Sequence, residues 1–155
     1  MNFKEFADRI RMIAEPAVRD TFYNGCVNEL TGRVLSKVVK KTPVSAGVFT
    51  VDPNTKKRVK VAPGGTLRQR WNAIPSAKHG KVYEGKVLNN VKYASYVEHG
   101  HRQHVGQYVP VLGKRLKKPW VPGAHMLQKS HDEVKKDAEK IVRRRFRQYL
   151  KKGFE

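Results

Sequence analysis

Apolar residues recur at every fourth position between residues 18 and 38, and this repeat is what most limits the fold of the chain. The repeat consists of Val18, Phe22, Cys26, Leu30, Val34 and Val38. A spacing of four places side chains on one face of an α-helix. Pro16 suits the first turn of a helix, and Pro43 cannot continue one. We therefore predict a helix from Pro16 to about Lys41.

Helical spacing also marks both ends of the chain. Residues 2–14 begin with Asn2 and Glu5, which suit the first turn of a helix, and continue with apolar residues at helical intervals. The last predicted helix covers residues 124–152. Ser130 and Glu133 have the spacing of a capping box, so this helix begins near residue 124 or begins again at Ser130.

The centre of the chain has the shorter period of β-strands. Residues 48–51 and 56–61 alternate around the turn residues 52–55, which predicts a basic hairpin. Residues 82–89 are predicted as a further strand, residues 91–98 as another strand or a strand that runs into a short turn, and residues 99–122 as mainly loop. The predicted fold is a single α+β domain over residues 1–155. In it a long N-terminal helical segment (1–41) and a C-terminal helix (124–152) pack on one antiparallel sheet (44–98).

Positive charge dominates the composition. The chain has 33 Lys and Arg against 13 Asp and Glu, and residues 42–131 contain 16 of these cations but only Asp52, Glu84 and Glu98. Such a charge attracts polyanions or an acidic protein partner. Two turn-rich segments hold many of the cations, and we predict that these tips contact a partner or DNA. They are Lys56, Lys57, Arg58 and Lys60, and Lys114, Arg115, Lys117 and Lys118.

The sequence contains little that suggests chemistry. Cys26 is the single cysteine, so no disulfide within the chain is expected, and no segment has the composition of a membrane span. No nucleophile motif, acid pair or phosphate-binding glycine loop is present, which predicts a protein without a catalytic role or cofactor. The residues His99, His101 and His104 could bind zinc, but the turn at Gly100 disturbs their geometry and we predict no metal site.

Four short segments occur in a characteristic order. They start with a Thr-Pro-Val segment and Leu67 to Trp71, continue with Tyr93 to Arg102, and end with Pro-Gly before the last helix. In this order they resemble the neck and tail-completion family of tailed bacteriophages and phage-tail-like particles. The positions that carry the resemblance are Pro43, Gly47, Leu67, Trp71, Tyr93, Ala94, Tyr96, Glu98, Gly100, His101, Arg102, Pro122 and Gly123. The hairpin of residues 48–61 looks like an insertion relative to that family.

The resemblance implies a structural protein of the virion neck, made in the bacterial cytoplasm. It implies a ring of six-fold or twelve-fold symmetry that completes or caps the tail and joins it to the head or connector. Its partners would be copies of itself, the adjacent neck and tail-tube proteins, and DNA in the channel, contacted without regard to sequence. The motif residues would serve the fold and the subunit interface, with Glu98 paired to Arg102 or His101.

Two other functions remain open at this point. Trp71, Tyr93, Tyr96 and Trp120 lie near cations, as in proteins that bind single-stranded nucleic acid, so the chain could be a stand-alone nucleic-acid-binding protein. The same aromatic residues are equally typical of a core or a subunit interface, and we favour that interpretation. The other open function is a metal-dependent enzyme that uses the histidines. Ring formation without nucleic acid would distinguish the neck protein from the stand-alone nucleic-acid-binding protein.

Overall fold

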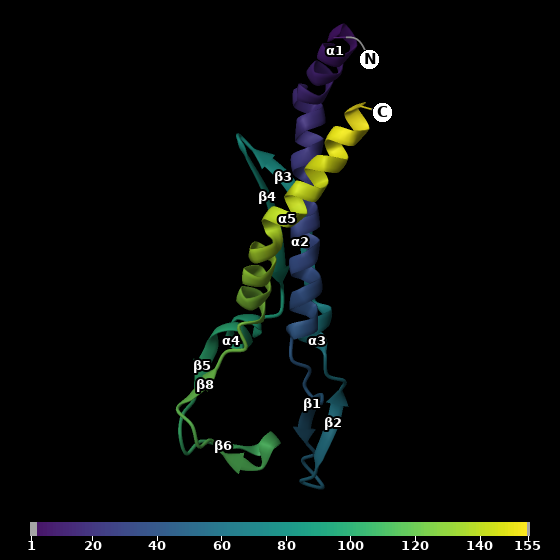
Figure 1. Ribbon diagram of the computed structural model, residues 1–155. Helices are drawn as coiled ribbons and strands as arrows, with labels where there is room; N and C mark the ends of the chain where they lie inside the picture. The colour runs from purple at the N-terminus through teal and green to yellow at the C-terminus, as the bar shows by residue number, and fades with distance from the viewer. Residues whose placement is uncertain (1–2, 155) are drawn as a thin grey trace. The chain divides into compact units, whose positions relative to one another are not determined.

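The computed structural model describes residues 3–154, apart from the side chain of Val48 (Figure 1). Its helices are α1 (Phe3–Ala14), α2 (Pro16–Lys41), α3 (Thr66–Gln69), α4 (Ala94–His99), the 3-10 helix η1 (Pro110–Leu112) and α5 (Met126–Phe154). Its strands are β1 (Val48–Val51), β2 (Arg58–Ala62), β3 (Trp71–His79), β4 (Val82–Asn89), β5 (Gly100–Arg102), β6 (Tyr108–Val109), β7 (Lys114–Arg115) and β8 (Trp120–Pro122).

The chain forms two compact units. The first, which we call the helical unit, comprises residues 3–36, 73–88 and 131–154 of the described range; the second, the basic unit, comprises residues 37–72 and 89–130. The helical unit contains α1, the β3–β4 hairpin and the longer parts of α2 and α5. The basic unit contains the other strands and the short helices. The prediction of a single domain over residues 1–155 stays a prediction.

The helical unit is built on α2 and α5. The predicted helix from Pro16 to Lys41 is confirmed, and its residue Cys26 lies in the core with Val134 and Ile141 of α5. Burial raises the pKa of the Cys26 thiol, as expected for a structural cysteine. Nearby, the ring of Phe22 packs at 4.9 Å from Tyr149, measured between ring centroids. The apolar repeat therefore covers the C-terminal helix.

A charged cluster ties the same two helices together. The carboxylate of Glu29 accepts hydrogen bonds from Arg33, at 2.8 Å, from Arg145, at 2.6 Å, and from Arg144. Burial acts to raise the pKa of Glu29, but the hydrogen bonds from these guanidinium groups outweigh it and lower the pKa to about 2. The cluster thus stabilises the folded helical unit at neutral pH.

The β3–β4 hairpin lies against α2. The Ser76 amide donates to the Asn28 side-chain oxygen at 2.6 Å, and the Ser76 hydroxyl donates to the Asn24 side-chain oxygen at 2.6 Å. On β4, a side chain at Gly85 would collide with Thr31 of α2, so glycine permits the close approach. Strand β4 was predicted with its exact bounds, whereas β3 was not predicted at all. The small residues of β3 and its Pro75 have low strand propensity, so the strand conformation is stabilised by pairing with β4.

The basic unit contains the predicted hairpin. Strands β1 and β2 pair in antiparallel register, with Thr50 opposite Val59 and Val51 opposite Arg58. Between the strands, the Asp52 carboxylate accepts the amides of Asn54, at 2.8 Å, and Thr55, at 3.2 Å. These backbone hydrogen bonds lower the pKa of Asp52. The turn predicted from composition is therefore an aspartate-centred turn.

A hydrogen-bonded core joins the end of α2 to Trp71. Thr42 is fully buried, and its hydroxyl donates to the Val38 carbonyl at 2.6 Å and accepts from the Trp71 indole at 2.8 Å. The Arg68 guanidinium donates to the Thr42 carbonyl at 2.7 Å. This network satisfies polar groups at the C-terminal end of α2 and fixes Arg68 and Trp71 against it.

The α+β class is confirmed, but the single sheet is corrected. Within the described residues the strands form four two-stranded ladders: β1–β2, β3–β4, β5–β8 and β6–β7. Turns and short helices separate these ladders along the chain, so the two-stranded pieces do not join. No helix within residues 3–154 has the length and apolar content that a membrane crossing requires.

The predicted strand over residues 91–98 is also wrong, because residues 94–99 form α4. The side chain of Asn89 accepts the Val91 amide at 3.1 Å and donates to the Leu67 carbonyl at 2.7 Å. This turn directs the chain into a helical conformation, in which the Val97 amide bonds the Tyr93 carbonyl. Such a short segment does not decide between helix and strand by its own periodicity.

Candidate functional site

Two of the four segments that carry the family resemblance meet in one structure, which we call the motif clasp (residues 93–102 and 120–127). Strand β5 pairs with β8 in antiparallel register: Gly100 lies opposite Pro122, His101 opposite Val121, and Arg102 opposite Trp120. The ladder brings together positions about twenty residues apart in the sequence. The clasp therefore gives these two segments a common structural role in this chain.

Two glycines allow the clasp to close. Gly100 has a φ of 85°, a conformation that favours glycine, and a Cβ there would collide with the carbonyl of Val121. At Gly123 a Cβ would collide with the backbone of Glu98, His99 and Gly100. Backbone atoms cannot yield as a flexible side chain can. Both motif glycines are therefore required by close backbone contact.

Glu98 joins the clasp to the last helix. Its side chain is buried, and its two carboxylate oxygens accept the amides of Leu127, at 3.0 Å, and Gln128, at 3.1 Å. The Ala124 and His125 amides bond the carbonyls of Val97 and Glu98. A carboxylate is well placed there, because the first amides of a helix have no partners within the helix and its N-terminus is electropositive.

This arrangement corrects one prediction and decides between two alternatives for the start of the last helix. Glu98 binds the start of α5 and does not form the expected pair with Arg102 or His101. Helix α5 begins at Met126, so Ser130 does not cap it; the Ser130 hydroxyl is buried and donates to the Met126 carbonyl at 2.6 Å. The cap is supplied by a residue 28 positions before the helix, which a local pattern cannot reveal.

Three aromatic residues of the clasp face outwards. Tyr93, Tyr96 and Trp120 are 45%, 59% and 47% exposed. Tyr96 also meets the His101 ring edge to face, with centroids 5.9 Å apart. Trp71, by contrast, is buried in the core of the basic unit. Of the four aromatic residues noted in the sequence, one is buried in the core and three are exposed on the clasp.

The remaining motif residues belong either to the segments that follow α2 or to the clasp itself. Leu67 is buried, and Pro43 directly follows the fully buried Thr42. Gly47 has a φ of 134°, and a Cβ there would collide with β2. Ala94 opens α4, Arg102 ends β5 and is exposed, and Pro122 ends β8. The structure assigns these residues local roles; their part in a subunit interface stays a prediction.

The three histidines do not converge on a metal site within the described residues. His99 and His104 are exposed, while the Nδ1 atom of His101 is buried and has no hydrogen-bond partner. No group of three His, Cys, Asp or Glu side chains within residues 3–154 could hold a metal ion. The His125 Nδ1 atom is buried without a partner as well.

Both basic tips lie in the basic unit. All eight predicted partner-facing cations are exposed: Lys56, Lys57, Arg58, Lys60, Lys114, Arg115, Lys117 and Lys118. The guanidinium of Arg58 stacks over the Phe49 ring at 3.8 Å from its centroid, and Arg115 donates to the Gly106 carbonyl at 2.7 Å. Residues 37–72 and 89–130 carry sixteen Lys and Arg but two carboxylates, a formal charge of sixteen minus two, or +14. Both carboxylates, Asp52 and Glu98, are occupied by backbone amides.

A small cavity lies between the two tips. We call it the tip cavity; its volume is about 380 Å³, and it is lined by Val51, Lys56, Arg58, Tyr108, Pro110, Val111, Leu112 and Gly113. The contact of β1 with η1 brings its walls together. The cavity was not predicted, because it depends on contact between segments about fifty residues apart, and neither segment alone signals it.

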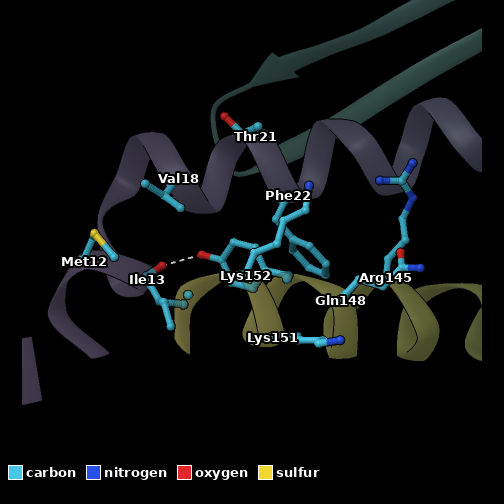
Figure 2. A pocket seen from close by; sticks show the side chains of 11 residues that line it. Met12, Ile13, Val18, Thr21, Phe22, Arg145, Gln148, Lys151 and Lys152 are labelled. Atoms are coloured by element: carbon cyan, nitrogen blue, oxygen red, sulfur yellow. Dashed lines mark hydrogen bonds between the residues drawn. The ribbon is translucent and has the colours of Figure 1, made fainter. Parts of the chain in front are cut away.

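A second cavity lies within the helical unit, between α2 and the end of α5 (Figure 2). Its volume is about 810 Å³, and its lining includes Met12, Ile13, Val18 and Phe22. The Tyr149 hydroxyl donates to the Ile13 carbonyl across it. The lining contains no carboxylate or histidine, and the Thr21 hydroxyl there donates to the Ala17 carbonyl at 2.9 Å.

Comparison with known proteins identifies one family. A family model described as "Bacteriophage HK97-gp10, putative tail-component" matches residues 4–100, which is more than half of the chain. The match includes both long helical segments of the N-terminal part, the β1–β2 hairpin and the motif residues up to Gly100. No curated protein and no solved structure matches the chain.

Proposed function

Because the chain belongs to the HK97-gp10-like family of bacteriophage tail components, we propose that it is a neck protein that completes or caps the tail. In this role it forms a ring and joins the tail to the head or connector. The coarser function, a structural component of the phage tail, follows from the family itself. The ring, its position in the neck and its neighbours are the parts that we propose.

The motif clasp is the observation that supports this proposal most directly. Its inner residues, Glu98, Gly100 and Gly123, hold the backbone in one arrangement, while its aromatic residues lie outside. The constrained backbone of the clasp thus carries exposed aromatic side chains. Such side chains are typical of a binding surface, since Tyr and Trp are enriched at protein interfaces. The clasp is therefore the proposed contact between adjacent subunits.

A ring needs a heterologous contact, in which a surface on one subunit meets a different surface on the next. Tyr93, Tyr96 and Trp120 would form one side of this contact. Exposed apolar residues elsewhere in the chain would form the complementary surface on the adjacent subunit. Helix α1, for example, has four exposed apolar residues: Phe3, Phe6, Ile10 and Met12. Six-fold or twelve-fold symmetry is the expectation that the family resemblance supports.

The basic unit would meet the anionic partner of the ring. With sixteen cations, and both carboxylates occupied by backbone amides, its field attracts any polyanion that approaches. If the ring surrounds the DNA channel, these cations would contact phosphates without reading sequence. The same charge is what a stand-alone nucleic-acid-binding protein would show, so charge does not separate the two functions.

Assembly of the purified protein separates them. We expect light scattering and electron microscopy to show rings, in the absence of nucleic acid, alone or at the ends of added tail tubes. Tyr96→Ala and Trp120→Ala should prevent ring closure while the monomer stays folded. Tyr108→Ala is the matched control, since Tyr108 is 53% exposed and lies outside the clasp. A protein that stays monomeric with tail tubes but binds duplex DNA would support the stand-alone function instead.

A further inference from the structure

We propose that the tip cavity binds an acidic segment of a neighbouring protein, through an aliphatic side chain that enters the cavity and carboxylates that meet its cations. This inference rests on the proposed function, because it names the partner of the basic unit within the neck. It chooses protein over nucleic acid, and the choice comes from the lining of the cavity.

The walls combine apolar surface with fixed positive charge. Val51, Val111 and Leu112 supply the apolar surface, and Leu112 is 52% exposed in the absence of a partner. Lys56 and Arg58 stand at the same cavity. An aliphatic side chain that filled this space would remove apolar surface from water on both partners.

Arg58 is prepared to receive a carboxylate. In the β1–β2 ladder Val51 lies opposite Arg58, so the two side chains share the face of the hairpin that also carries Phe49. The Phe49 ring covers one face of the guanidinium at 3.8 Å. Its N–H groups point outwards in the plane of the guanidinium, where they can bind a carboxylate with two parallel hydrogen bonds.

Charge complementarity fixes the sign of the occupant. The cavity belongs to a unit with a formal charge of +14, in which Asp52 and Glu98 both bind backbone amides. A basic or neutral segment would therefore meet repulsion or no attraction, whereas an acidic one would be steered towards the cavity.

Duplex DNA fits the charge but not the cavity. Its outer surface consists of phosphates and sugars, which offer no projecting aliphatic side chain to fill a space of about 380 Å³. An unpaired base could enter and stack on Tyr108. The aliphatic walls favour an aliphatic side chain, so both forms of nucleic acid become outcomes of the test.

The test measures binding to the purified full-length protein by calorimetry at physiological salt. The probes are a peptide with leucine between acidic residues (Asp-Glu-Leu-Glu-Asp), its twin with serine in place of leucine, a short duplex and an unpaired oligo-dT. We expect the leucine peptide to bind at least about tenfold more tightly than the serine twin. Leu112→Ser should remove that preference, and Leu112→Met, which keeps the apolar volume, should retain it.

Two adjacent lysines give a matched control for charge. Lys56 lines the cavity and Lys57 does not, although both are exposed. Lys56→Gln should weaken binding of the leucine peptide severalfold, and Lys57→Gln should change it by less than about twofold. Equal losses in the two variants, or equal binding of the two peptides, would overturn the proposal. Tighter binding of the duplex or of oligo-dT than of the leucine peptide would overturn it too and identify nucleic acid as the partner.

The outcome is independent of ring formation, since the binding measurement needs neither a ring nor a particle. If the protein is found in the neck by electron microscopy and the peptides bind alike, the inference about the cavity fails and the proposed function stands. If the protein is absent from the neck, the proposed function fails whatever the peptides do.

Discussion

The two units use their charges in opposite ways. In the helical unit, carboxylates bind cations: Glu29 holds three arginines, and Asp20 accepts from Lys78 at 2.5 Å and from the Tyr83 hydroxyl. In the basic unit, the two carboxylates, Asp52 and Glu98, bind backbone amides. The sequence counts agree: residues 1–36, 73–88 and 131–155 carry seventeen cations and eleven acids, against sixteen and two for the basic unit.

The comparison shows that charged residues in one chain can act on folding in one unit and on binding in the other. Charge in the helical unit contributes to folding, because the paired groups join elements of the same unit. Charge on the tips of the basic unit contributes to binding, because exposed cations on turn-rich segments gain little from their own fold. Substitutions in the two units should therefore separate stability from binding.

The largest effect is expected at the glycine that closes the motif clasp. Gly123→Ala places a methyl group against the backbone of Glu98 and Gly100, so the clasp must open. We expect a loss of about 3 kcal/mol or more in the free energy of unfolding, measured by chemical denaturation. Gly32→Ala is the control, since Gly32 lies in α2 with no atom near its missing side chain, and it should be neutral or stabilising. Equal effects at the two glycines would mean that the clasp is not rigid.

The next effect concerns the carboxylate cluster of the helical unit. The pKa of Glu29 is lowered to about 2 in the folded protein from an ordinary value of 4.5. A lowered pKa contributes stability that is complete above pH 4.5 and is lost as the pH falls towards 2. Glu29→Gln should therefore cost about 2 to 3 kcal/mol at pH 7 and less as the pH falls through this window. Thermal unfolding of both proteins between pH 2 and 7 measures it, and parallel curves would contradict the assignment.

A smaller effect is expected at the end of α2. Thr42→Val keeps the shape of a fully buried side chain but removes the hydroxyl that accepts from the Trp71 indole at 2.8 Å. The indole N–H is then buried without a partner, and we expect a loss of about 1 to 2 kcal/mol. Thr50→Val, at an exposed site in β1, is the control and should leave the melting temperature nearly unchanged. The tryptophan fluorescence of Thr42→Val should shift as the hydrogen bond is lost.

The smallest effect on stability is expected at the basic tips. Changing Lys114, Lys117 and Lys118 together to serine should alter the free energy of unfolding by no more than about 0.5 kcal/mol per site, because these side chains are exposed. Binding of an acidic peptide or duplex should weaken, and the difference from the unmodified protein should shrink at high salt, where such contacts are screened. A triple variant that unfolds would show that charge in the basic unit serves folding after all.

Several elements could be predicted from local sequence because local interactions decide them. Proline and a four-residue apolar repeat were enough to place α2, and an aspartate-centred turn was enough to place the β1–β2 hairpin. The elements that were missed depend on distant partners: β3 relies on β4 and on Asn24 and Asn28 of α2, and α4 relies on the turn at Asn89. The order of the motifs was visible in the sequence, but their meeting in the clasp was not.

The sequence by itself determined the α+β class, the long helices, the excess of positive charge and the family to which the chain belongs. These follow from periodicity, composition and motif order, which are properties of neighbouring residues. Only the tertiary structure decided which charges remain available and where the last helix begins. Glu98 looked like a partner for a nearby cation, yet it caps α5 at Leu127 and Gln128. The reason is that orphan amides at a helix start bind a buried carboxylate wherever the chain can bring one, at any separation in sequence.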